Sequence, residues 1–105
     1  MMGVLLLISF TAYSQQAFTL NGVIKDKGTT ENLTGVNILF PDLGTGTVSN
    51  EYGFYSIRLP QGTHRVVFTY LGYSTLSQEI NMSENTTLNV ELEEATQSLD
   101  EVVIE

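Results

Sequence analysis

The amino-acid sequence predicts an all-β protein in which two sheets pack as a sandwich. Apolar and polar residues alternate with a period of two along most of the chain after residue 16, which is typical of strands with one buried face. Turn-forming Gly, Asn, Asp and Pro residues separate these runs. No segment keeps the period of about 3.6 residues that marks an amphipathic helix. Roughly six or seven short strands, each with one apolar face, must cover one another, so we expect two packed sheets.

Each expected strand is defined by the apolar residues that share its inner face. In chain order these sets are Phe18, Leu20 and Ile24; Val36, Ile38 and Phe40; Tyr55, Ile57 and Leu59; Val66, Phe68 and Tyr70; Leu76, Ile80 and Met82; and Leu88, Val90 and Leu92. The intervening turns are predicted at Lys27-Gly28, Asp42-Leu43-Gly44, residues 50–53, Pro60-Gln61-Gly62 and Leu71-Gly72.

Length and charge limit what the protein can do. The chain has 105 residues, enough for one small domain, and a net charge of -8. From Glu84 onward there are seven acidic residues and no Lys or Arg. Nucleic acid is therefore not an expected partner, because its binding needs a basic surface. The absence of Cys excludes a disulfide framework, a thiolate metal site and a lipid-modified Cys.

The N-terminal segment predicts export. Residues 4–12 form an apolar run of signal-peptide length, too short to span a bilayer, and Ala12 and Ser14 supply the small residues that signal peptidase reads. We expect residues 1–14 to be a signal peptide cleaved after Ser14, which leaves Gln15 first. The alternative is a buried first strand.

The C-terminal segment predicts a strand that pairs outside the domain. The acidic pair Asp100 and Glu101 follows Leu99 and precedes three β-branched apolar residues, Val102, Val103 and Ile104. Such a segment satisfies its backbone by joining a sheet edge of another protein or of a larger parent protein. The alternative is a disordered tail. The acidic pair either protects this run from aggregation or sets the register of docking.

The sequence offers no constellation for catalysis, a metal or a cofactor. His64 is the sole His, so a multi-His zinc site is impossible, and its inward-alternating position predicts a packing role at the sandwich rim with the polar edge of its ring near water. No nucleophile motif accompanies the Ser and Asp residues. We therefore predict no catalytic residues, no metal ligands and no cofactor. Tyr52 and Phe54 are the aromatic residues expected to be exposed, and a glycan-binding role for them stays open.

Four motifs resemble one domain family. They are Asn21-Gly22-Val23-Ile24, Leu33-Thr34-Gly35-Val36-Asn37-Ile38, residues 46–57 and residues 66–73. In this order and spacing they resemble the carboxypeptidase-regulatory-like domain. The resemblance implies a prealbumin-like (transthyretin-like), seven-stranded antiparallel Greek-key β-sandwich, here at residues 15–95. Two Asp positions of the family's turn hold Asn50 and Tyr52, which argues against Ca²⁺ there.

The C-terminal residues extend this resemblance. Residues 99–104 are similar to the segment that follows this domain in SusC/RagA-like TonB-dependent outer-membrane receptors, where it overlaps a TonB-box-like stretch. The resemblance implies a non-catalytic N-terminal interaction module whose residues 96–105 are an acidic linker with a docking strand. Its implied partners are a TonB-type periplasmic energy-coupling protein and the plug and barrel of a parent receptor. Its implied location is the periplasmic side of a Gram-negative outer membrane.

The sequence leaves open whether the chain is a fragment of such a receptor or a stand-alone copy of its module. A stand-alone exported sandwich would bind a glycan or an envelope protein.

Overall fold

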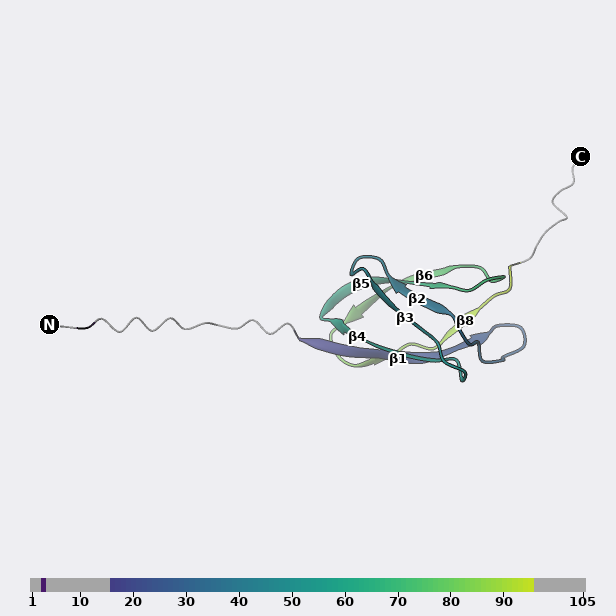
Figure 1. The fold of residues 1–105 in the computed structure, drawn as a ribbon, viewed down its shortest axis with the longest axis horizontal. Helices are drawn as coiled ribbons and strands as arrows, with labels where there is room; N and C mark the ends of the chain where they lie inside the picture. The colour runs from purple at the N-terminus through teal and green to yellow at the C-terminus, as the bar shows by residue number, and fades with distance from the viewer. Residues whose placement is uncertain (1–2, 4–15, 96–105) are drawn as a thin grey trace, which may run out of the picture.

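The computed structural model describes Gly3 and residues 16–95. Apart from Gly3, the predicted signal peptide at residues 1–14 lies outside the described residues, and so does the predicted strand at residues 99–104. The described chain forms eight strands (Figure 1), and these are β1 (Ala17–Asp26), β2 (Asn37–Phe40), β3 (Thr45–Val48), β4 (Phe54–Pro60), β5 (Gly62–Thr69), β6 (Leu76–Met82), β7 (Thr86–Thr87) and β8 (Val90–Leu92). Within these residues there is no helix of the length and hydropathy that a membrane crossing needs.

The strands are arranged as two sheets, which confirms the predicted sandwich. In the first sheet, β1 pairs antiparallel with β4 on one side, and with β7 and then β8 on the other. The second sheet has the order β3-β2-β5-β6, and its neighbouring strands are all antiparallel. β1 starts at one end of the sandwich, and the described chain leaves at the opposite end (Figure 1).

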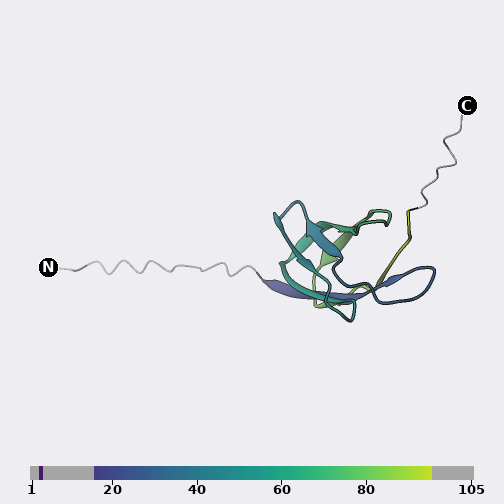
Figure 2. The same ribbon diagram turned by 45° about the vertical axis from the view of Figure 1, so that its right-hand side comes forward.

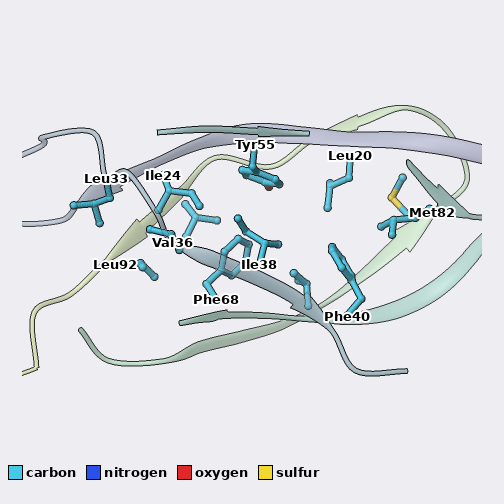
Figure 3. Close-up of a cluster of buried hydrophobic side chains, with 13 residues drawn as sticks. Leu20, Ile24, Leu33, Val36, Ile38, Phe40, Tyr55, Phe68, Met82 and Leu92 are labelled. Carbon is cyan, nitrogen blue, oxygen red and sulfur yellow. The ribbon is translucent and has the colours of Figure 1, made fainter. Parts of the chain in front are cut away.

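The core lies between the two sheets and consists of the residues that alternate inward. Figure 3 shows side chains from both sheets pointing toward one another. The fully buried members are Leu20, Ile24, Val36, Ile38, Phe40, Tyr55, Leu59, Val66, Phe68, Met82 and Leu92. All of them belong to the predicted inward-facing sets. The period-two pattern therefore identified the core correctly, because each strand buries only one face.

The last predicted strand differs from the prediction in two ways. It is split into β7 and β8, which raises the number of strands from seven to eight, and both parts run parallel to β1. The split occurs at Leu88, whose N–H donates to the Asn21 carbonyl at 2.7 Å and whose carbonyl accepts from the Tyr55 hydroxyl at 2.6 Å. A Cβ on Gly22 would lie 1.9 Å from the Leu88 carbonyl oxygen, so this kink requires glycine.

Two asparagine side chains complete the hydrogen bonding of β1 around the kink. The Thr19 N–H donates to the Asn85 Oδ1 at 2.9 Å, and the Val23 N–H donates to the Asn89 Oδ1 at 3.0 Å. Backbone donors of β1 that β7 and β8 do not reach are thus paired by side chains.

Strand β3 was not predicted as an alternating strand. Its four residues, Thr45–Val48, contain a single apolar side chain beyond glycine and threonine, and that residue, Val48, is exposed. β3 is the edge of its sheet, held by antiparallel pairing with β2. Backbone hydrogen bonds rather than a buried apolar face therefore hold this strand in place.

Candidate functional site

The predicted docking strand itself lies outside the described residues. The residues that lead from the sandwich toward it, 93–95, are described. Residues 93–95 follow β8 directly, and they carry the chain out of the sandwich at the end opposite the start of β1 (Figure 2). The same end carries the loop of residues 70–75, which connects β5 to β6. Leu71 in this loop is 96% exposed. The site is therefore built from the last strand of one sheet and a loop of the other.

Backbone pairing fixes the exit segment to this loop. Residues 93–95 run antiparallel to residues 72–74. The contacts are the Ser74 N–H to the Glu93 carbonyl at 2.9 Å, the Ala95 N–H to the Gly72 carbonyl at 2.9 Å, and an isolated bridge between Tyr73 and Glu94. We call this arrangement, residues 72–74 with residues 93–95, the exit clamp. It joins the two sheets at the point where the chain leaves them.

The buried carboxylate of Asp26 is hydrogen-bonded to the exit clamp. Asp26, the last residue of β1, is only 4% exposed. Its Oδ1 accepts from the backbone N–H groups of Gly28 at 2.7 Å and Thr29 at 3.0 Å, and its Oδ2 accepts from the Tyr73 hydroxyl at 2.5 Å. The side chain of Asp26 thus ties the end of β1 to the middle residue of the loop that holds the exit.

This hydrogen bond shifts the pKa of both partners. The Tyr73 hydroxyl, followed by the backbone donor of Thr29, holds the pKa of Asp26 below its ordinary value of 3.8. The carboxylate of Asp26, together with partial desolvation, raises the pKa of Tyr73 to about 12. At neutral pH, Asp26 is therefore ionised and the Tyr73 hydroxyl keeps its proton. The pair is satisfied, so it serves as a structural support rather than as an acid or a base.

His64 has the inward position that was predicted, but its ring is bonded differently. The side chain is 8% exposed, and its Nε2 lies 2.7 Å from the Pro60 carbonyl oxygen. The prediction placed the polar edge of the ring near water. The tight turn between β4 and β5 instead brings a backbone carbonyl to the ring nitrogen, so His64 is a packing residue whose polar edge is bonded within the protein.

The turn at residues 50–53 is built as predicted. The Asn50 Oδ1 accepts from the N–H groups of Tyr52 at 2.9 Å and Phe54 at 3.0 Å. Gly53 has a φ of 75°, and its carbonyl accepts from the Ile24 N–H at 2.8 Å. Among residues 16–95, no group of three or more His, Asp or Glu side chains gathers where it could hold a metal ion.

Aromatic residues outside the fully buried core gather in two places, one at the turn before β4 and one at the exit clamp. Tyr52 and Phe54 are 65% and 41% exposed, as predicted; Tyr52 lies on the turn between β3 and β4, and Phe54 is the first residue of β4. Tyr70 is half-buried against the core, and its ring packs on Tyr73 with a centroid distance of 5.3 Å and an angle of 47°. Tyr70 thus packs on the tyrosine of the exit clamp, whereas Tyr52 and Phe54 belong to a different surface.

Comparison with known proteins identifies the domain. The model of the family described as "CarboxypepD_reg-like domain" matches residues 20–104. A TonB-dependent receptor of Formosa agariphila is 32% identical over 100 residues, covering 95% of this chain, and the TonB-dependent receptor SusC of Bacteroides thetaiotaomicron is 33% identical over 97 residues, covering 92%. The chain spans only 10% and 9% of these two receptors.

Solved structures share the fold at low sequence identity. A type II cohesin–X–dockerin complex from Acetivibrio cellulolyticus contains a chain that matches with a TM-score of 0.62 and 17% identity, over 70% of this chain and 52% of that one. The C-terminal domain of a shaft pilin from Lactobacillus rhamnosus GG matches with a TM-score of 0.54 and 13% identity, over 77% of this chain and all of that one.

The fold and the match over residues 20–104 define an all-β, carboxypeptidase-regulatory-like sandwich. The chain belongs to this family, and it is homologous to the N-terminal region of TonB-dependent receptors, which are receptors rather than enzymes.

Sequence reasoning missed the exit clamp and its support. Asp26 and Tyr73 are separated by 47 positions, and neither stands in a pattern that predicts the other. A local signal was nevertheless present. An Asp placed just before Lys27-Gly28 is typical of a side chain that caps its own turn, and that role fixes the carboxylate in place.

Proposed function

We propose that this chain is the non-catalytic N-terminal interaction module of a TonB-dependent outer-membrane receptor. Residues 99–104 then act as a strand that docks a TonB-type energy-coupling protein. One observation carries this proposal above all. Among the described residues 16–95, both sheets are paired, the buried core extends from Leu20 to Leu92, and the exit clamp ends at Ala95. We therefore expect the sandwich to fold without residues 99–104, which leaves that segment available for docking.

Two further features support a docking role for the tail. The family match continues to residue 104, so the tail belongs to the same evolutionary unit as the sandwich. The tail also combines an acidic pair with three β-branched apolar residues, and this composition suits addition to a sheet edge. The exit clamp gives that strand a fixed point of departure from the folded domain.

The expected affinity suits a coupling element that must release its partner. Pairing of about five residues, at ~0.5–1.5 kcal/mol for each backbone hydrogen bond, gives a net gain of a few kcal/mol. A net gain of about 4 kcal/mol corresponds to a dissociation constant of about 1 mM. Backbone pairing of this strength between the docking strand and its partner is weak and readily reversible.

The proposed location follows from the same relationship. The receptors that this chain resembles are about ten times its length, so a plug and a barrel would follow the module in a parent protein. The module would then stand on the periplasmic side of the outer membrane, after export and removal of residues 1–14. Mass spectrometry of the exported protein should find Gln15 as the first residue. A mature protein that still carries Met1 would contradict cleavage.

A titration tests the docking role directly. A peptide of residues 97–105 is added to the isotope-labelled C-terminal domain of a TonB protein from a related bacterium. We expect chemical-shift changes confined to one edge strand of the partner. A peptide with the same composition in scrambled order is the matched control and should give weaker, scattered changes. No shift in the partner at millimolar peptide would overturn the proposed docking role.

A further inference from the structure

A hollow on the outer face of the first sheet has the size and lining of a small-molecule site. It lies beside the turn of residues 50–53, where β1 and β8 run next to each other, and its volume is about 650 Å³. Sites for small ligands commonly measure about 300–1,000 Å³. The side chains that line it and matter here are Val23, Lys25, Asn32, Tyr52, Asn89 and Glu91. The exit clamp contributes none of them.

Backbone hydrogen bonds hold the floor of the hollow in place. The Ile24 N–H donates to the Gly53 carbonyl at 2.8 Å, and the Leu33 N–H donates to the Ile24 carbonyl at 2.9 Å. Asn32 forms a bridge with Lys25, which holds it against β1. A ligand would therefore meet a preformed surface, and little ordering entropy would oppose its binding.

Tyr52 supplies an aromatic face that the fold leaves uncovered. Its N–H donates to the Asn50 Oδ1, which fixes the backbone of the turn, while 65% of the residue stays exposed. Phe54, which is opposite Val23 in the β1–β4 register, adds a second exposed ring on the same face. Exposed aromatic rings next to a hollow provide apolar area without a large loss of side-chain entropy.

The polar groups of the hollow offer both donors and acceptors. Asn89 lines the hollow, and since its Oδ1 accepts from the Val23 N–H, the group of this amide that can still serve a ligand is the Nδ2 donor. Lys25 and Glu91 are direct partners in the β1–β8 register, so one cation and one anion share the same face of the sheet. Because these charges offset each other, the hollow favours a neutral ligand over an anion or a cation.

We propose that this hollow binds a neutral pyranose sugar. A pyranose ring has an apolar face of C–H groups that packs on Tyr52, and its rim of hydroxyls both donates and accepts hydrogen bonds. Those hydroxyls match the carboxylate of Glu91, the ammonium of Lys25 and the Nδ2 of Asn89. The site is independent of the tail, so the sugar-binding role and the docking role can fail separately.

Nuclear magnetic resonance of the full, ¹⁵N-labelled chain tests the proposal. The probes are the methyl glycosides of glucose, galactose, mannose and N-acetylglucosamine, each added to a concentration of about 100 mM. We expect at least one of them to shift the amide signals of Val23, Lys25, Asn32 and Tyr52 and the side-chain amide of Asn89, with a dissociation constant in the millimolar range. Saturation transfer from the Tyr52 ring to the sugar should accompany these shifts.

Two substitutions separate the proposed contacts from general effects. Tyr52→Ala removes the ring and should weaken binding by about tenfold or more, whereas Tyr52→Phe keeps the ring and should retain it within about threefold. Leu71→Ala, on an exposed side chain outside the hollow, is the control and should leave binding unchanged. The proposal is overturned if none of the four glycosides shifts these signals, or if the shifts persist unchanged in Tyr52→Ala.

Discussion

Single residues rather than large surfaces fix the middle and the end of β1. At its middle, Gly22 lets the Leu88 carbonyl approach the strand closely enough to bond with the Tyr55 hydroxyl. At its end, Asp26 accepts three hydrogen bonds and supports the exit clamp. Both positions have consequences that can be measured, because each is satisfied by one specific geometry.

Replacing Gly22 should be among the more damaging small substitutions in this protein. In Gly22→Ala, the new methyl group meets the Leu88 carbonyl oxygen at 1.9 Å, so β1 and the kink must separate. We expect a loss of about 1–3 kcal/mol in the free energy of unfolding, measured by chemical denaturation. Gly28→Ala is the matched control, since its Cβ makes an ordinary contact at 3.4 Å, and it should change stability by no more than about 0.5 kcal/mol. Equal losses in both variants would contradict this account of the kink.

The Asp26–Tyr73 pair predicts a loss of stability at both extremes of pH. The pKa of Asp26 is lowered on folding, so its contribution is present above its ordinary value of 3.8 and is lost as pH falls through the folded pKa. The pKa of Tyr73 is raised from 10.0 to about 12, so its contribution is present below pH 10 and is lost as pH rises toward 12. Burial also raises the pKa of Tyr55, which adds to the alkaline loss.

Unfolding free energies measured across these two windows check the prediction. Tyr73→Phe should remove part of the alkaline slope and leave the part that belongs to Tyr55, and Asp26→Asn should flatten the acid slope. If Tyr73→Phe kept the full alkaline slope of the parent protein, the hydrogen bond would not have the role given to it here.

Among the strands, the sequence predicted those with an apolar inner face and missed those held by other means. Ile38 and Phe68 lie in alternating runs, and both are fully buried as predicted. β3 has no such run, because it is an edge strand whose backbone pairs with β2. The parallel pairing of β8 with β1 was also unpredictable from local pattern, since it depends on where Leu88 turns the chain.

We expect the exit clamp to open locally while the two sheets stay folded. Tyr73→Phe removes the bond to Asp26 but leaves the core intact, so we expect faster hydrogen exchange at the amides of Ser74 and Ala95. The amides of the β2–β5 ladder should keep their protection. Tyr70→Phe is the matched control, because the structure gives the Tyr70 hydroxyl no hydrogen bond within the described residues. Equal acceleration in both variants would mean that the hydroxyl of Tyr73 does not hold the clamp.

At the scale of the whole molecule, a closed sandwich carries two separate surfaces. The exit clamp directs the chain out at one end, and the hollow beside Tyr52 opens on the outer face of the first sheet. The hollow and the exit clamp have no residue in common, so a substitution in one leaves the contacts of the other in place. This separation is why a docking tail and a ligand site can be tested independently. It also explains why the candidate site at residues 99–104 was predicted from composition alone, whereas the hollow needed the fold.

If residues 99–104 are the docking strand, the sandwich must be stable without them. Val102→Pro removes one backbone donor from the docking strand, while Val102→Thr keeps that donor and the β-branched shape. In the full chain, we expect both variants to keep the melting temperature of the parent protein, and only Val102→Pro to abolish binding to the TonB C-terminal domain. A large fall in melting temperature for Val102→Pro would show that the tail belongs to the fold, and undiminished binding would show that it is not the docking strand.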